Sequence, residues 1–208
     1  MTRYQFIEKE LRQIYGGYIP DDSEITFELV NKWIQEAFGI AAKQCYKESA
    51  QIEAVGYLNN SFYTTFKGIS VVQDEQFLWK VTLPQIPVGI GYNEGISTMV
   101  FKDSTNQVSL PVVWLSENQK TYIHTMRRIP NKVLAYPEGI YVYALSTLIL
   151  SQYTVSVTMV SGGDSTDLNS VFNLPDDYYP VVSEYIKAQL GFERAQPKDQ
   201  ANDGSDNK

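Results

Sequence analysis

The sequence has almost none of the side chains on which most enzyme sites depend. Cys45 is the only cysteine and His124 the only histidine among 208 residues. A single cysteine excludes an internal disulfide framework, and Cys45 lies among helical residues, where it is expected to be a small buried apolar group. Serine and cysteine triads and most zinc sites use histidine, and no second member of such a set is recognisable near His124. We therefore expect no enzyme activity, no metal and no cofactor.

Long apolar runs are also missing. The longest apolar zone, 140–150, is interrupted by Ser146 and Thr147, well short of the roughly 18 apolar residues that a membrane span needs. The opening residues Met1-Thr2-Arg3-Tyr4 lack the apolar run of a signal peptide. No membrane association is expected.

Basic residues are too few and too scattered to form a nucleic-acid-binding surface. The chain carries 17 Lys and Arg against 24 Asp and Glu, a net charge of −7, and the only adjacent basic pair is Arg127-Arg128. Proteins that hold DNA cluster lysine and arginine to displace counterions. An acidic surface suits a wall that DNA passes without binding.

Three motif-like patterns are expected to carry no chemistry. Gly89, Gly91 and Gly95 lack the spacing of a nucleotide loop and lead into a strand rather than a helix. The aspartates of 199–206 lack the alternating ligands and closing glutamate of a calcium loop. Asp176-Asp177 stands at a helix start, where carboxylates favour the helix dipole, so capping is preferred to metal binding.

Tyrosine is the abundant residue, with 15 copies. A tyrosine ring packs against apolar groups while its hydroxyl reaches water or a partner, which suits interfaces. Tyrosine also favours strands, so a tyrosine-rich sheet explains the count equally well. Both interpretations stay open.

Helical periodicity appears at both ends of the chain. A first helix is predicted over 3–15 and ends at Gly16-Gly17. A second is predicted from about 22 to 54, capped by Asp21, Asp22 or Ser23. At about 45 Å it suits a strut packed beside copies of itself, or an ordinary helix lying along a sheet. The apolar stripe of this helix is Ile25, Leu29, Trp33, Ala37 and Ala41. A last helix is predicted to open at 173–180 and to run to about Phe192.

The middle of the chain alternates apolar and polar residues with the period of strands. The alternation is clearest over 77–83 and 153–159. Pro111 suggests that its strand is an edge strand or bulged. Further strands are predicted at 62–67, 69–73, 97–102, 108–115, 132–136 and 140–145. A Pro/Gly loop, 84–95, joins two of them.

Helices followed by strands and a further helix favour an α+β fold with an antiparallel β-rich middle. The expected divisions are 1–56 (an N-terminal helical hairpin with one long helix), 57–173 (β-rich), 174–194 (C-terminal helix) and 195–208 (an extended polar tail). That tail has no aromatic and no large aliphatic residue. It cannot bury enough surface to offset its ordering entropy, so we expect a neighbouring molecule to order it.

Short phrases at 24–34, 83–87, 93–96, 137–142 and 174–179, with the tail 197–203, occur in a familiar layout. Together they resemble virion structural proteins of crAss-like and related tailed bacteriophages, in particular their head-to-tail connector or ring proteins. The resemblance covers most of the chain and depends on layout rather than on a diagnostic motif. The compact adaptors of podoviruses are mostly helical, whereas about half of this chain is predicted to be β.

The resemblance implies a virion protein, synthesised in the host cytoplasm, that forms a ring of typically about twelve copies around the tail axis. Such rings stack below the portal and contact the portal protein, other connector rings or the tail hub, and DNA leaves through the channel without specific binding. The expected subunit contacts are Trp33, Pro84, Ile86, Pro87, Tyr92, Pro197, Asp199, Asn202 and Asp203.

A different class of function stays open as an alternative. A β-rich module on a virion or cell surface could recognise carbohydrate or protein, with Trp79 and Trp114 stacking on sugars. The competing interpretation places both tryptophans in the core, and the strand alternation favours it. A hydrolase that uses paired carboxylates ranks last, because no pair stands out.

Overall fold

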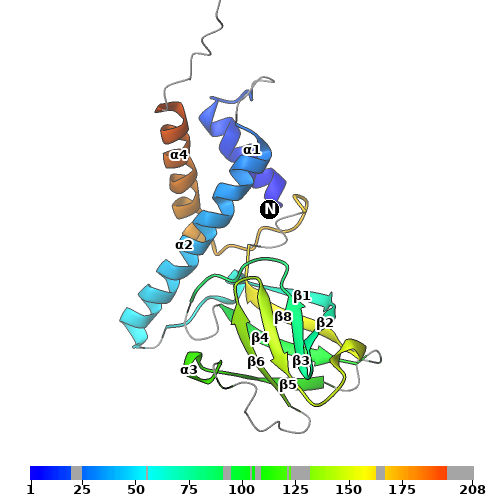
Figure 1. Cartoon of the computed structure of the whole chain (residues 1–208). Coiled ribbons are helices and arrows are strands. Elements are labelled where there is room, and N and C mark those ends of the chain that lie inside the picture. Colours follow the sequence, from blue (N-terminus) through cyan, green and yellow to red (C-terminus); the bar gives the residue numbers. More distant parts are fainter. Residues whose placement is uncertain are drawn as a thin grey trace, which may run out of the picture.

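The computed structural model has the predicted α+β composition: three long helices beside one curled sheet (Figure 1). In Figure 1 the helices gather at the upper left, the strands lie at the lower right, and the C-terminal part of α2 reaches down beside the sheet. The structure describes residues 1–19, 25–54, 56–90, 95–103, 105, 109–120, 122, 132–162 and 167–195.

Helix α1 (Arg3–Ile14) begins at a capping box, as its sequence allows. The hydroxyl of Thr2 accepts from the Gln5 backbone N–H at 3.2 Å, and the Gln5 side chain accepts from the Thr2 N–H at 2.9 Å. These bonds satisfy two N–H groups that a helix start leaves unpaired. Gly16 and Gly17 follow with φ of +69° and +111°, a backbone that glycine adopts without strain. The predicted end of this helix is confirmed.

Helix α2 (Phe27–Glu53) is capped by Thr26, whose hydroxyl accepts from the Leu29 N–H at 3.2 Å. The cap therefore lies later than the predicted Asp21, Asp22 or Ser23, which fall outside the described residues. With 27 residues the helix is about 40 Å long. Trp33, Ala37 and Ala41 of its predicted stripe are buried among helices of the same chain, so the stripe does not serve a packing of α2 against copies of itself.

Helix α4 (Tyr179–Ala195) packs along α2, and a 3₁₀ turn, Asp176–Tyr178, precedes it. Two tyrosine hydroxyls fasten the pair: Tyr178 donates to Glu48 at 2.6 Å and Tyr185 donates to Glu36 at 3.0 Å. The order of these contacts makes the two helices antiparallel. Together with α1 they enclose an apolar core that includes Phe6, Ile34 and Ile186.

The sheet contains all eight predicted strands. They lie in the order β1-β8-β4-β5-β6-β7-β3-β2. Their bounds are β1 (Tyr63–Ile69), β2 (Val71–Glu75), β3 (Leu78–Thr82), β4 (Ile96–Lys102), β5 (Ser109–Trp114), β6 (Val133–Glu138), β7 (Tyr141–Leu145) and β8 (Thr154–Val160).

The sheet is mixed rather than purely antiparallel as predicted. Strand β6 runs parallel to β5, because the connection 115–132, which contains the short helix α3 (Glu117–Lys120), is long enough for a crossover. The other pairs of neighbouring strands in the described chain are antiparallel.

The two edge strands follow each other in the chain with only Ser70 between them, so the sheet curls back on itself. A second corner lies in β5, where 109–111 pair with β4 and 112–114 pair with β6. Pro111 is the last residue of β5 that pairs with β4, just before the residues that pair with β6. β5 lies inside the sheet rather than on its edge. The edge prediction for Pro111 is wrong; a proline is tolerated here because the ladder to one neighbour stops beside it.

The inner face of the curled sheet is packed with apolar side chains. Phe101, Val142 and Val157 are fully buried there, and Trp79 is 5% exposed. The predicted alternation in β3 is confirmed, with Trp79 and Val81 inside. Leu78 is also buried, on the outer face, in a small cluster with Leu134 and Leu145.

The helical core reaches the sheet, since it includes Val160 of β8, but the inner face of the sheet forms a separate apolar cluster. Phe38 of α2 meets Phe62, just before β1, with ring centroids 5.4 Å apart. Buried Arg3 joins several segments: its Nη1 donates to Asn31 Oδ1 at 3.0 Å, its backbone N–H donates to the Ser170 carbonyl at 3.0 Å, and its guanidinium lies 5.6 Å from the Phe172 ring centroid. Arg3 thus ties the start of α1 to α2 and to residues 170–172.

Candidate functional site

The Pro/Gly loop predicted to contact a neighbour is fastened to its own chain at most described positions. Pro87 is buried, and Val88 lies 3.8 Å from where a side chain at Gly39 of α2 would begin. Pro84 and Ile86 face outward, and Ile86 is 69% exposed. Pro84 and Ile86 are therefore accessible to a partner, whereas Pro87 supports the loop. Tyr92 lies outside the described residues.

A hollow of about 280 Å³ lies beside Ile86, where the loop meets α2 and the start of α1. Phe38 and Val88 give it an apolar side, and Gln35, Glu36 and Gln85 give it a polar one. It holds no nucleophile paired with a base. Its chemistry is that of a contact pocket for a side chain rather than of a reaction centre.

Trp33 and the tail were also predicted to make subunit contacts. Trp33 is 5% exposed and packs inside the helical core, so it supports the fold of its own subunit. Pro197, Asp199, Asn202 and Asp203 lie outside the described residues, as does His124. Of the predicted contacts, the structure places Pro84 and Ile86 on the surface.

The tip of α2 presents a further exposed apolar side chain. Ile52 is 82% exposed. The turn that follows is held firmly, because the Ser49 hydroxyl donates to the Tyr57 carbonyl at 2.8 Å and accepts from the Tyr57 N–H at 2.9 Å. Ile52 thus stands on a fixed support at the end of the longest helix.

The outward side of α2 is rich in lysine. Lys43 and Lys47 lie one turn apart, and Lys32 lies three turns before Lys43, so the three share one side of the helix. All are exposed, and none forms an ion pair within the described part of the chain. Exposed Ile40 lies among them. The carboxylate of Glu36, which accepts from the Tyr185 hydroxyl at 3.0 Å, lies on the same side, so the lysines outnumber it three to one. We call Lys32, Ile40, Lys43 and Lys47 the lysine face.

The outer side of the curled sheet carries a row of tyrosines. Strand register places Tyr136, Tyr143, Lys80 and Val72 directly opposite one another across β6, β7, β3 and β2. The Tyr136 and Tyr143 rings stack with centroids 5.3 Å apart, and Lys80 Nζ lies 5.2 Å from the Tyr141 ring centroid. No helix of the described chain covers this row as α1 and α4 cover α2.

Carboxylates surround the row. Lys80 donates to Asp74 at 3.1 Å, Glu138 lies opposite Tyr141, and Glu75 lies opposite Leu78. Burial, followed by the negative charge of Glu138, raises the pKa of the Tyr136 hydroxyl; Asp74 and Glu75 contribute in the same direction. The tyrosine face comprises Val72, Asp74, Glu75, Lys80, Tyr136, Glu138, Tyr141 and Tyr143.

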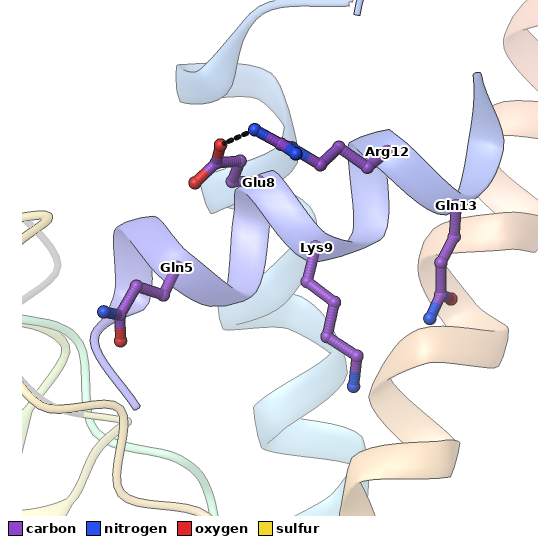
Figure 2. A pocket seen from close by; sticks show the side chains of 5 residues that line it. All are labelled: Gln5, Glu8, Lys9, Arg12 and Gln13. Atoms are coloured by element: carbon purple, nitrogen blue, oxygen red, sulfur yellow. Dashed lines mark hydrogen bonds and ion pairs between the residues drawn. The ribbon is translucent and has the colours of Figure 1, made fainter. Parts of the chain in front are cut away.

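A shallow depression on α1 offers only a solvated helix surface (Figure 2). Its side chains, Gln5, Glu8, Lys9, Arg12 and Gln13, all come from the side of α1 that faces away from the core, and Arg12 pairs with Glu8 at 2.7 Å. Because one helix supplies every group, nothing closes over a ligand there, and we assign it no site.

The described part of the chain shows neither a metal-binding cluster nor a membrane-spanning helix. Its residues form no cluster of histidine, cysteine and carboxylates able to hold a metal, and no helix among them has the length and hydropathy to span a bilayer. Cys45 is buried, as predicted. Trp79 lies inside the sheet, where it cannot stack on a sugar. Trp114 is half-buried against the same core, and its sugar-stacking role stays a prediction.

Sequence reasoning missed both charged faces. The lysine spacing was readable, since positions 32, 43 and 47 fall on one side of any helix that covers them. Tyr141 and Tyr143 lie two apart in a predicted strand, so they also share a side. The order of the strands decides which side of the sheet faces outward and brings Tyr136 and Lys80 beside Tyr141 and Tyr143. Local periodicity in the sequence does not reveal that order.

Comparison with known proteins leaves the family open. No protein-family model matches the chain, and no curated protein matches it either.

Proposed function

We propose that this protein is a structural subunit of an oligomeric ring in the head-to-tail connector of a tailed bacteriophage, with no catalytic role. The ring forms part of the DNA exit channel and joins neighbouring virion proteins: the portal protein, other connector rings or the tail hub. The support comes from the sequence resemblance, from the net charge of −7 and from the surface of the subunit.

The observation that carries the proposal is the set of outward isoleucines on rigid supports. Ile40 and Ile52 project from α2, and Ile86 projects from the adjoining loop. Ile40 is followed by Ala41 in the helical core, and Ile86 is followed by the buried Pro87. Ile52 lies among exposed residues near the end of α2. Apolar side chains held in fixed positions on the outside of a complete core are typical of surfaces that a partner covers.

The first test is the mass and shape of the full chain, by native mass spectrometry with negative-stain imaging. Rings, or a ladder of oligomers that grows with concentration, are expected. Ile86→Asp should shift the distribution toward monomer, because it places a charge in the contact. Tyr18→Asp is the matched control, since Tyr18 is similarly exposed at the far end of α1. A chain that stays monomeric alone and with portal protein added contradicts the proposal.

A second candidate, a carbohydrate-recognising module, retains one specific observation. Tyr141 is 38% exposed on the outer sheet face, with Lys80 and Glu138 close by to bond hydroxyl groups. An aromatic ring flanked by polar side chains suits the apolar face of a sugar. Binding on a glycan array that Tyr141→Ala abolishes would favour this function; an array without binding removes it.

A further inference from the structure

We propose that the lysine face of α2 on one copy of this chain docks on the tyrosine face of the next copy. The inference rests on the proposed ring function and deepens it, because it identifies the two surfaces that join neighbouring subunits. Neither surface has a counterpart in the described part of its own chain.

The charges of the two faces complement each other. Lys32, Lys43 and Lys47 stand together on a protein whose net charge is −7, without ion pairs among the described residues. The tyrosine face contributes Asp74, Glu75 and Glu138. Opposite potentials on two patches steer their encounter and fix their register. Among the described residues Lys80 pairs with Asp74, and Lys120 lies near Tyr136. The net charge of Asp74, Glu75 and Glu138 still favours an approaching lysine.

The tyrosine rings add a second kind of attraction. Lys80 already lies over Tyr141, and Lys120 Nζ lies 5.5 Å from the Tyr136 ring centroid, so these rings attract ammonium groups in the subunit itself. Tyr141, which is 38% exposed, leaves part of its ring accessible to a lysine of the neighbour. Ile40 and Val72, which are 44% and 58% exposed, supply an apolar contact inside the charged rim.

The dimensions of the two faces agree. From Lys32 to Lys47 the helix rises about 22 Å. Four neighbouring strands, β6, β7, β3 and β2, extend about 14 Å between their outer axes, and the residues from Leu78 to Thr82 extend about 13 Å along β3. A helix can therefore lie diagonally across the sheet face with all three lysines near it.

The two faces belong to different elements, one to α2 and the other to four strands of the sheet. In Figure 1, α2 lies at the left, whereas β2 and β3 lie toward the right. A contact between two different surfaces of identical subunits is heterologous, and it closes into a ring when the rotation per step divides a full turn. A self-complementary patch would instead stop at a dimer.

Charge reversal in the full chain tests the contact. K43E/K47E and E75K/E138K should each weaken self-association by about tenfold or more, measured by sedimentation velocity at fixed salt. Combining all four substitutions should restore association, because both faces are then reversed. The matched control is K9E/K187E, which adds the same negative charge as K43E/K47E at exposed lysines of α1 and α4.

Each result separates the alternatives. Rings that form in the wild type and persist in both reversed variants overturn the interface and leave the ring function standing. Weakening without restoration in the combined variant also overturns it. If K43E/K47E loses binding to duplex DNA while its self-association is unchanged, the lysine face meets nucleic acid instead. A wild-type chain that is monomeric alone and with portal protein overturns both the interface and the ring.

Discussion

Glu10 is a carboxylate buried between α1 and α4 with little to compensate it. Its Oε1 accepts from the Ser183 hydroxyl at 2.7 Å, and its Oε2 has no hydrogen-bond partner in the described part of the chain. Burying a charge is costly unless hydrogen bonds satisfy it. The Ser183 hydroxyl is therefore the group that makes this position tolerable.

Ser183→Ala is expected to lower the free energy of unfolding by about 1–3 kcal/mol, because it leaves the buried carboxylate without its bond. Urea denaturation at neutral pH measures the change. Ser109→Ala, at an exposed serine, is the control and should leave stability unchanged. Replacing both partners, as Glu10→Met with Ser183→Ala, should recover the loss. Equal stability of the Ser183→Ala chain and the wild type would contradict this account.

The ring of Tyr46 lies so close to Gly56 that it leaves no room for a side chain at this position. A Cβ at this position would lie 2.3 Å from Tyr46 Cζ, closer than atoms can approach. We expect Gly56→Ala to destabilise the chain by about 1–3 kcal/mol, the usual cost of overpacking, and to loosen the turn that supports Ile52. Gly89→Ala is the control, since no atom lies within 4 Å of its added Cβ. Thermal unfolding of the two variants tests the contrast.

Local rules predicted individual residues well where a local interaction decides them. The Gly16-Gly17 stop and buried Cys45 depend on a few neighbours. Trp33 and Ile86 were predicted together as contact residues, yet one lies in the core and the other on the surface. Hydrophobicity alone does not distinguish an interface from a core, because the same side chains serve both.

At the level of elements, α4 is held to α2 by hydroxyl–carboxylate bonds at two points, Tyr178–Glu48 and Tyr185–Glu36. The bond from Tyr178, followed by one from Gln44, lowers the pKa of Glu48. Burial, followed by the bond to Glu48, raises the pKa of the Tyr178 hydroxyl. The pair is thus strongest with a charged glutamate and a neutral tyrosine.

This pairing predicts how stability changes with pH. Because the pKa of Glu48 is below 4.5 in the folded chain, its contribution is present above that value and is lost as pH falls through the folded pKa. Because the pKa of Tyr178 is above 10, its contribution is lost as pH rises beyond that value. Tyr178→Phe should therefore flatten both limbs of the plot of denaturation midpoint against pH. Tyr18→Phe should reproduce the wild-type curve; loss of both limbs in this control as well would exclude the pair as their origin.

The sequence predicted the existence of the strands but not their arrangement. All eight were expected, because their alternation is strictly local. Their order, the parallel β5–β6 pair and the turn of β5 at Pro111 depend on contacts between distant segments. The tyrosine face exists only in that order, since β6, β7, β3 and β2 must be neighbours to form it.

At the level of the whole molecule, charge is distributed unevenly. The net charge is −7, yet Lys32, Lys43 and Lys47 lie together on one side of the longest helix. If those lysines contact carboxylates of the next copy, they are covered in the assembly. The surface that remains exposed is then acidic, although each separate chain has a basic patch. An acidic wall repels DNA, which favours its passage through a channel.

Segment 196–208 should matter for assembly and not for folding. It has no aromatic and no large aliphatic residue, so it can bury little apolar surface in the fold. Deleting it should therefore change the free energy of unfolding by less than about 0.5 kcal/mol. Assembly should weaken, because a polar segment of this kind gains order only against a neighbour.

The comparison to make is between the deletion and a chain in which 196–208 is replaced by a Gly/Ser sequence of equal length, by calorimetry for folding and native mass spectrometry for assembly. Both variants should unfold at the same temperature as the full chain, and both should form fewer oligomers. Normal assembly of the Gly/Ser chain would mean that only the length of the segment matters. Normal assembly of the deletion would show that the segment joins no subunits, and the contacts between copies would then depend on the folded faces alone.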